Sequence, residues 1–254
     1  MTAAYVVEAL KLRRSRVVVV VTVALLVVPA LLARVFLIAA ERGGADPMST
    51  KAALLLPGVG WPGYVGGLVQ VYATAGVVGA GVVVAWCFGR EYADRTVVSL
   101  YASATPRTSV AKAKLVLLTA WSVAVGTGVA GAAAVIGLAT GLGLPDAADW
   151  RALARLGLLA VLSGFLALPV AAPASIGRGY LPGIGGLMVL VVTAQVAVVA
   201  GAGTWWPWSV AAVWAMGGAS GMEPVAPAWL VVVPLVAALG AYTTVTWWQR
   251  AEVV

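Results

Sequence analysis

The sequence has no histidine, a single cysteine and no phosphate-binding loop, and each absence excludes a class of function. Without histidine, serine-triad catalysis and histidine-ligated metal or haem sites are excluded. The lone Cys87 permits neither a disulfide framework nor a thiolate metal site. Because the pattern GxxxxGK[ST] is missing, the chain does not bind ATP in that manner. We therefore expect a non-enzymatic chain with no catalytic residue, no metal and no cofactor of its own.

Acidic residues are few, and they are missing from the interior of every long apolar run. Six such runs can each cross a bilayer. The acidic residues all lie between or beside these runs: Glu8, Glu41, Asp46, Glu91, Asp94, Asp146, Asp149, Glu223 and Glu252. Proton- or cation-coupled transporters usually bury an ionisable group in a span, and intramembrane aspartyl proteases need paired buried aspartates. If the chain moves a substrate uphill, we expect the energy to come from another subunit.

The composition, 62% hydrophobic and 10% charged, is that of an integral membrane protein. We expect an all-α, polytopic membrane protein with a single transmembrane domain over residues 1–254. The first apolar run exceeds the length of a signal-peptide core, which favours a retained span. Six transmembrane helices are expected, at approximately 17–40, 65–88, 115–142, 156–174, 181–203 and 228–248.

Lysine and arginine are distributed unequally between the two sides of this expected domain. With the N-terminus inside, the cytoplasmic side holds Lys11, Arg13, Arg14, Arg16, Arg90, Arg95, Arg107, Lys112, Lys114, Arg178 and Arg250. The other side holds Arg42, Lys51, Arg151 and Arg155, with Arg34 close to it. The positive-inside rule therefore predicts that both termini are cytoplasmic. Orientation thus explains the net charge of +7 without a nucleic-acid partner. The high alanine, valine and glycine content fits a high-GC bacterial source, and we expect a multi-pass protein of the bacterial plasma membrane.

Two segments outside the spans are expected to lie at the membrane surface. Residues 2–15 predict an N-terminal interfacial helix, with Glu8 and Lys11 on one face and Leu12 on the other. The alternative is an irregular basic leader that only orients the first span. The segment 204–227 is rich in tryptophan and is expected to form short helices that dip into the outer leaflet. Its tryptophans either anchor it at the interface or contact a substrate.

The connection between the second and third spans, residues 89–114, has the clearest polar pattern in the chain. A charged turn that begins at Gly89 is followed by a short apolar stretch, which Thr105-Pro106 should end. A short cytoplasmic helix of this kind can dock a soluble partner. The alternative is an ordinary loop whose charges are merely solvated.

This pattern resembles the type-2 ABC-transporter permeases. Members commonly show a Glu, then Gly-Thr, an apolar helix, a Pro-x-Ser-Arg-like turn and a Lys that opens the next span. Here Glu91, Arg95-Thr96, Pro106-Arg107 and Lys114 occupy these places, with Arg95 where Gly is usual. The resemblance extends to the six-span topology, and is greatest to the short permeases of bacterial drug, lantibiotic and sodium export systems.

The resemblance implies a permease subunit that exports an amphipathic or hydrophobic substrate by alternating exposure of a central pathway. A separate cytoplasmic ABC ATPase, in two copies, would hydrolyse ATP with Mg, and a second permease copy or a related permease would complete the pathway. The residues implied in ATPase coupling are Glu91, Tyr92, Asp94, Arg95, Thr96 and Arg178. In this reading Glu91 or Asp94 pairs with a basic residue of the ATPase. The alternative function is a non-transport membrane immunity or scaffold protein that acts through helix contacts.

The spans themselves hold few strongly polar side chains. Gln70 and Gln195 either join helices by hydrogen bonds or line a substrate pathway. Arg34 either extends to the outer headgroups or faces an outer cavity that meets an anionic or amphipathic cargo.

The run Gly126–Gly131 matches the dinucleotide pattern GxGxxG but is interpreted as a packing motif. No strand precedes it, and it lies inside the third expected span. Small residues recur there at every fourth position, in one series through Gly126 and Ala130 and in another through Gly128. Such spacing allows helix backbones to approach closely in lipid.

Overall fold

The computed structural model describes residues 2–42, 47, 50, 56, 58–94, 106–217 and 223–250. Within these residues every regular element is helical, and the six longest helical segments are apolar enough to cross a membrane. These segments are α2 (Arg16–Arg42), α4 (Gly60–Ala93), α6 (Arg107–Ala139), the composite Ala147–Ile176, α9 (Tyr180–Val199) and the composite Pro227–Arg250. The predicted fold class, an all-α protein with six membrane-spanning helices, is confirmed.

Each composite segment joins an α-helix to a 3-10 turn that contains proline, a residue without a backbone donor. The fourth consists of α7 (Ala147–Ala167), a 3-10 turn η1 (Leu168–Val170) that contains Pro169, and α8 (Ala171–Ile176). The sixth consists of the 3-10 turn η3 (Pro227–Val231) and α11 (Val232–Arg250). Two shorter helices complete the fold, namely α1 (Thr2–Arg14) and α10 (Pro207–Met216).

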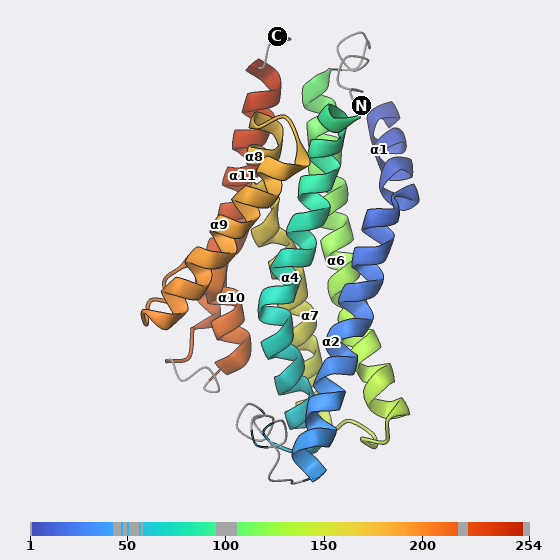
Figure 1. Ribbon diagram of the computed structural model, residues 1–254, viewed down its shortest axis with the longest axis vertical. Coiled ribbons are helices and arrows are strands. Elements are labelled where there is room, and N and C mark those ends of the chain that lie inside the picture. The colour runs from blue at the N-terminus through green and yellow to red at the C-terminus, as the bar shows by residue number, and fades with distance from the viewer. Residues whose placement is uncertain are drawn as a thin grey trace.

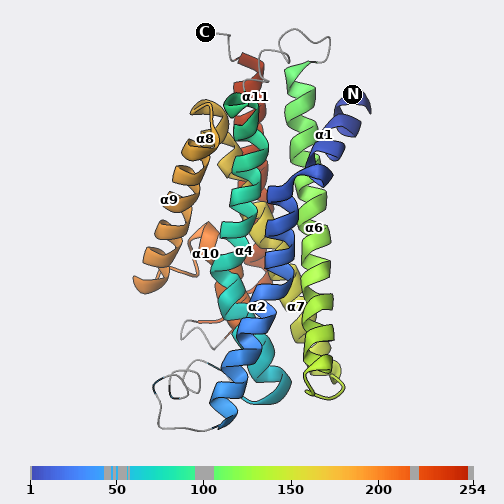
Figure 2. The same cartoon turned by 45° about the vertical axis from the view of Figure 1, so that its right-hand side comes forward.

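The long helices run side by side along one axis, with α4 at the centre (Figures 1 and 2). Helix α4 packs against α2, α7 and α9, and α6 packs against α7 and α2. We call one end of this bundle the α1 end, because α1 lies there with the last turns of α4 and α11 and the first turn of α6 (Figure 1). At the opposite end lie the start of α4, the α6–α7 connection and α10.

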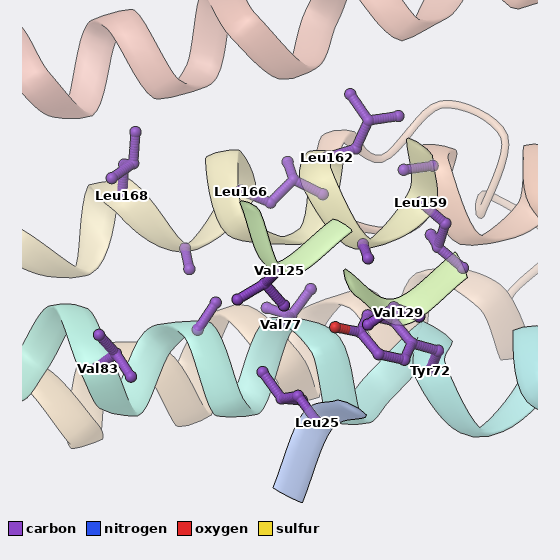
Figure 3. Packing of buried hydrophobic residues seen from close by; sticks show 14 of the residues in the cluster. Leu25, Tyr72, Val77, Val83, Val125, Val129, Leu159, Leu162, Leu166 and Leu168 are labelled. Atoms are coloured by element: carbon purple, nitrogen blue, oxygen red, sulfur yellow. The ribbon is translucent and has the colours of Figure 1, made fainter. Parts of the chain in front are cut away.

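The core is formed by aliphatic side chains that interlock between α2, α4, α6 and α7 (Figure 3). Val83 and Tyr72 of α4 are fully buried, and Leu25 of α2 and Val125 of α6 pack into the same cluster. In contrast, α9 leaves Met188, Val192 and Val196 exposed along its length. A bilayer would surround these side chains with hydrocarbon, so their exposure is expected for a membrane helix.

The two small-residue series of the third span face different helices. Gly126 and Ala130 lie against Gly157 of α7, and Gly128 lies against Leu26 of α2. The run Gly126–Gly131 is continuous α-helix, which confirms that it packs helices and is not a nucleotide-binding turn. Close approach on two sides lets α6 fit between its neighbours.

We expect Gly126→Ala to destabilise the bundle by about 1–3 kcal/mol, as overpacking does. A Cβ at Gly126 would lie 2.7 Å from the Gly157 carbonyl oxygen and 3.1 Å from the Val161 nitrogen, and backbone atoms cannot rotate away. Gly131→Ala is the matched control, because a Cβ there has nothing within 4 Å. Unfolding titrations of both variants in detergent measure the difference, and equal stabilities would contradict the packing role of Gly126.

Candidate functional site at the α1 end of the bundle

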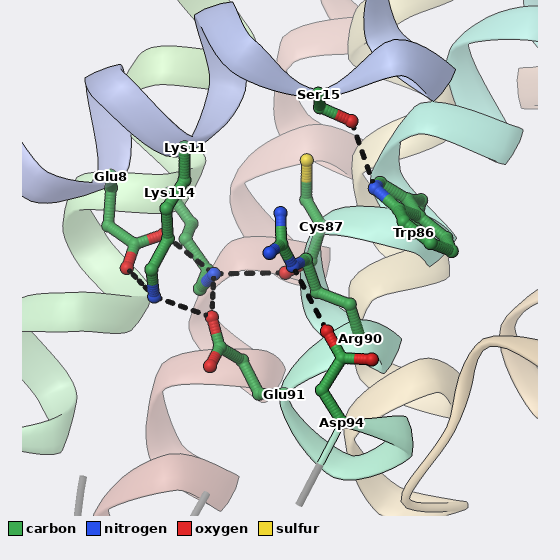
Figure 4. Close-up of polar contacts among 9 residues, drawn as sticks. All are labelled: Glu8, Lys11, Ser15, Trp86, Cys87, Arg90, Glu91, Asp94 and Lys114. Atoms are coloured by element: carbon green, nitrogen blue, oxygen red, sulfur yellow. Dashed lines mark hydrogen bonds and ion pairs between the residues drawn. The ribbon is translucent and has the colours of Figure 1, made fainter. Parts of the chain in front are cut away.

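Four charged side chains from three helices meet at the α1 end (Figure 4). We call this group, Glu8 and Lys11 of α1, Glu91 of α4 and Lys114 of α6, the charge cluster. Lys114 Nζ lies 2.7 Å from Glu8 Oε2 and 2.9 Å from Glu91 Oε1. Lys11 Nζ donates hydrogen bonds to Glu8 Oε1 at 2.8 Å and Glu91 Oε1 at 2.9 Å. Each lysine thus joins α1 to α4, and Lys114 also anchors both to α6.

Three of the four ionisable members of the charge cluster are buried. Glu91 is 1% exposed, Lys114 is 4% exposed and Glu8 is 5% exposed. Lys114 also donates a hydrogen bond to the Cys87 carbonyl oxygen at 3.0 Å. Two carboxylates and two ammonium groups balance in charge, which is how charges are tolerated away from water.

Lys11 is the most exposed member of the charge cluster, and it lies outside the membrane-spanning helices. Partial burial alone would lower the pKa of its ammonium group, but the hydrogen bonds and charges of Glu8 and Glu91 outweigh that effect and raise the pKa above its ordinary value. Lys11 therefore stays protonated at neutral pH, and its ion pairs persist there.

Helix α1 directs its charged face into the bundle. Glu8 and Lys11 point toward α4 and α6, whereas Val6, Val7 and Leu10 are exposed. The segment expected to form an interfacial helix is thus helical over Thr2–Arg14, and its position on a membrane surface stays a prediction. An apolar outer face is what such a surface helix requires.

Ser15 joins α1 to the next helix and to α4. Its Oγ accepts a hydrogen bond from the Val18 backbone nitrogen at the start of α2. It also accepts one from Trp86 Nε1 at 3.0 Å. The same indole ring packs on Tyr180 at the start of α9 and lies under the Arg90 guanidinium group. The orientation of α1 is therefore fixed by polar contacts at both the charge cluster and its C-terminal end.

Glu91 occupies a different place from the one expected from its sequence context. Helix α4 continues to Ala93, so Glu91 belongs to its last turns and not to a solvated loop. The pairing expected with a basic residue of a partner is made instead with Lys11 and Lys114 of the same chain. The physical reason is burial, because an enclosed carboxylate needs a cation at contact distance.

The other expected coupling residues are more peripheral. Tyr92 packs edge-on against Trp247 and Trp248 of α11, which ties the end of α4 to the sixth span. The Asp94 side chain is 53% exposed and lies 3.8 Å from Arg90. Arg95 and Thr96, with the short helix expected after them, lie outside the described residues.

Arg178 lies in the turn between α8 and α9, exposed at the α1 end. Its φ of 54° is in the left-handed region, unusual for a residue other than glycine. The turn rests on α4, because a Cβ at Gly89 would meet the backbone nitrogen and Cα of Tyr180. Close contact at Gly89 brings the Arg178 turn next to the helical turn that bears Glu91.

The three polar side chains inside the spans have different surroundings. Gln195 Nε2 of α9 donates a hydrogen bond to Thr74 Oγ1 of α4 at 2.9 Å, so it joins two helices. Arg34 donates to the Thr140 carbonyl oxygen at the C-terminal end of α6 and lies 3.7 Å from Glu41. Gln70 lines a cavity at the opposite end of the bundle. None of the three lies in the charge cluster.

Sequence reasoning missed that Glu8, Lys11 and Lys114 form one unit with Glu91. Two features were present in the sequence: Glu8 is the only acid in a basic N-terminal segment, and Lys114 lies between Ala113 and Leu115 at the start of an apolar run. A charge so placed usually has a partner. Nothing in the sequence, however, identifies Glu8, which lies 106 positions earlier, as one of the partners of Lys114.

The charge cluster suits a mechanical role better than a catalytic one. All its members are paired with one another, so none is placed to exchange protons with a substrate. Across the part of the chain that the structure describes, no three His, Cys, Asp or Glu side chains are grouped to hold a metal. What the geometry does is fix α1, α4 and α6 to one another at one end of the bundle.

Comparison with protein families gives a match to the family described as "ABC-2 family transporter protein" over residues 5–196. The matched region includes the whole charge cluster and the first four membrane-spanning segments. Comparisons with curated proteins and with solved structures gave no significant match.

Proposed function

This chain belongs to the ABC-2 family of transporter proteins, and we propose that it is a permease subunit that exports an amphipathic or hydrophobic substrate. Permeases of this family work with a cytoplasmic ABC ATPase. The family and the six apolar helices support a membrane subunit that supplies the pathway, with ATP and Mg bound by the partner. Export, the class of substrate and the bacterial plasma membrane are parts of this proposal.

The proposal places the α1 end of the bundle in the cytoplasm. The unequal distribution of lysine and arginine supports this orientation, since Arg13, Arg14 and Arg178 lie exposed at that end. Two ATPase subunits would then dock at the α1 ends of two permeases, on surfaces that include Asp94, Arg178 and the segment that carries Arg95 and Thr96. Exposed charges of both signs give such an interface register and specificity.

The observation that carries the coupling role is the charge cluster, which links α1 to the last turns of α4 and the first turns of α6. These turns flank the connection to which the ATPase is expected to bind. A movement imposed on that connection would reach α4 and α6 as rigid helices, and α1 would move with them. Glu91 therefore acts in coupling by holding helices together, while Asp94 and Arg178 meet the partner.

The proposal is tested by purifying the tagged protein in mild detergent from cells that also produce its ATPase. We expect a stoichiometric soluble partner with vanadate-sensitive ATP hydrolysis. The double charge reversal Asp94→Lys and Arg178→Glu should reduce the retained ATPase roughly tenfold or more, because like charges across an interface oppose binding. Arg42→Glu, at the opposite end of the bundle, is the matched control. Undiminished ATPase binding by the double variant would refute the docking surface, and a protein without any ATPase partner would refute the permease function.

A further inference from the structure

A cavity of about 390 Å³ lies at the end of the bundle opposite α1, between α4, α7 and α10. Its walls are largely apolar and include Val65 and Val69 of α4 and Met216 of α10. Gln70 is the polar side chain that α4 contributes. Small residues such as Gly66 and Ala152 leave the space open. The cavity is large enough for part of an organic molecule, which sets it apart from a gap that holds only a few waters.

The charged side chains that line this cavity are both arginines. Arg151 and Arg155 lie one turn apart on the same face of α7, and no acidic residue lines the cavity with them. Arg155 lies 5.4 Å from the centroid of the Trp214 ring of α10, a cation–π contact that fixes its guanidinium group. Arg151 donates to the Ala147 carbonyl oxygen of its own helix. Among the described residues, neither arginine forms an ion pair with a carboxylate.

The two acidic side chains at the start of α7, Asp146 and Asp149, bond the helix N-terminus. Asp146 Oδ1 accepts hydrogen bonds from the backbone nitrogens of Ala148 and Asp149, and Asp149 Oδ2 accepts one from the Asp146 backbone nitrogen, which makes a capping box. Backbone hydrogen bonds from Asp149 and Ala148, with a smaller contribution from Arg151, lower the pKa of Asp146. These carboxylates therefore stabilise the start of α7 and leave the guanidinium groups available to a ligand.

We propose that this cavity binds an amphipathic anion, with its apolar body against Val65, Val69 and Met216 and its phosphate or carboxylate head between Arg151 and Arg155. Guanidinium groups bind such heads through paired, charge-assisted hydrogen bonds. Gln70 adds an amide to the wall of the same cavity. The anion is either a membrane phospholipid or the exported molecule; the second source rests on the proposed function, and the binding does not.

The experiment measures binding to the purified permease in a neutral detergent, without the ATPase. The probes are dodecyl phosphate, dioctanoyl phosphatidylglycerol, inorganic phosphate and the cationic dodecyltrimethylammonium ion. We expect both anionic amphipaths to bind, and inorganic phosphate and the cation to bind far more weakly. The double variant Arg151→Gln and Arg155→Gln should weaken dodecyl phosphate binding roughly tenfold or more, because hydrogen bonds to charged groups are lost. Arg42→Gln is the matched control, since Arg42 is exposed at the same end and does not line the cavity.

A second variant distinguishes the contribution of the cavity space from that of the two arginines. Ala152→Phe should fill the cavity and weaken both anionic amphipaths with the arginines in place. Phospholipid that co-purifies with the parent protein and is lost from the arginine double variant would identify the membrane as the source. Binding of dodecyl phosphate by a protein that retains no phospholipid would identify the exported molecule, and not the membrane, as the source of the anion. Equal binding by parent and variants, or equal binding of the cationic probe, would overturn the proposal, whatever the ATPase experiment gives.

Discussion

Lys114→Met is expected to destabilise the protein by about 3–5 kcal/mol, the cost of breaking a buried ion pair by removing one partner. Methionine fills a similar volume but removes the ammonium group that lies 2.7 Å from Glu8 Oε2 and 2.9 Å from Glu91 Oε1. Both carboxylates are nearly excluded from solvent, so water cannot replace the lost ammonium group. The free energy of unfolding, measured by titration with a denaturing detergent, gives the effect directly.

Two further variants separate the loss of charge from loss of packing. Lys112→Met is the matched control, because Lys112 is exposed two residues earlier on α6, and it should change stability by no more than about 0.5 kcal/mol. The double variant Glu91→Leu and Lys114→Met removes one charge of each sign and should recover part of the loss. Equal stability of the Lys114→Met and Lys112→Met variants would show that the charge cluster does not hold the helices together.

Gly89→Val is expected to abolish ATPase-coupled transport and to lower stability by about 1–3 kcal/mol or more, as overpacking of a close backbone contact does. A Cβ at this position would lie 2.6 Å from the Gly179 carbonyl carbon and closer still to the Tyr180 backbone. The α8–α9 turn would have to move away from α4, and Arg178 would move with it. The surface proposed to dock the ATPase would then lose its geometry even if the bundle folded.

The measurement pairs transport in vesicles with unfolding in detergent. Gly185→Val is the matched control, since a Cβ there has nothing within 4 Å on the exposed side of α9. It should keep both activity and stability. Full transport by the Gly89→Val variant would exclude a role for the contact between α4 and the α8–α9 turn.

The sequence was sufficient for the number of membrane-spanning helices, because hydropathy alone determines which segments can cross a bilayer. The interruption of the fourth span was less clear in advance. Pro169 lacks a backbone donor, but a proline near the end of an apolar run can as easily end a helix as change its pitch. In the structure the η1 turn packs against Gly240 of α11, a contact between distant segments that supports the irregular backbone.

The sequence identified one member of the candidate site, Glu91, but not its partners. Glu91 was identified through a short motif, but its environment depends on α1, which is distant in sequence and approaches only in the folded bundle. Helix periodicity placed Glu8 and Lys11 on one face without indicating whether that face meets water or protein. The two arginines that line the cavity were assigned only to membrane orientation, since their shared face on α7 becomes a site only when α10 packs across it.

The charge cluster also has a consequence for biogenesis. Glu8 and Lys11 leave the ribosome well before Lys114, which follows only after two complete spans have been synthesised. Until then the charged face of α1 has no Lys114 ammonium group to pair with. When the third span inserts, Lys114 can form its ion pair with Glu8. The attachment of α1 therefore requires that the first three spans have assembled in register.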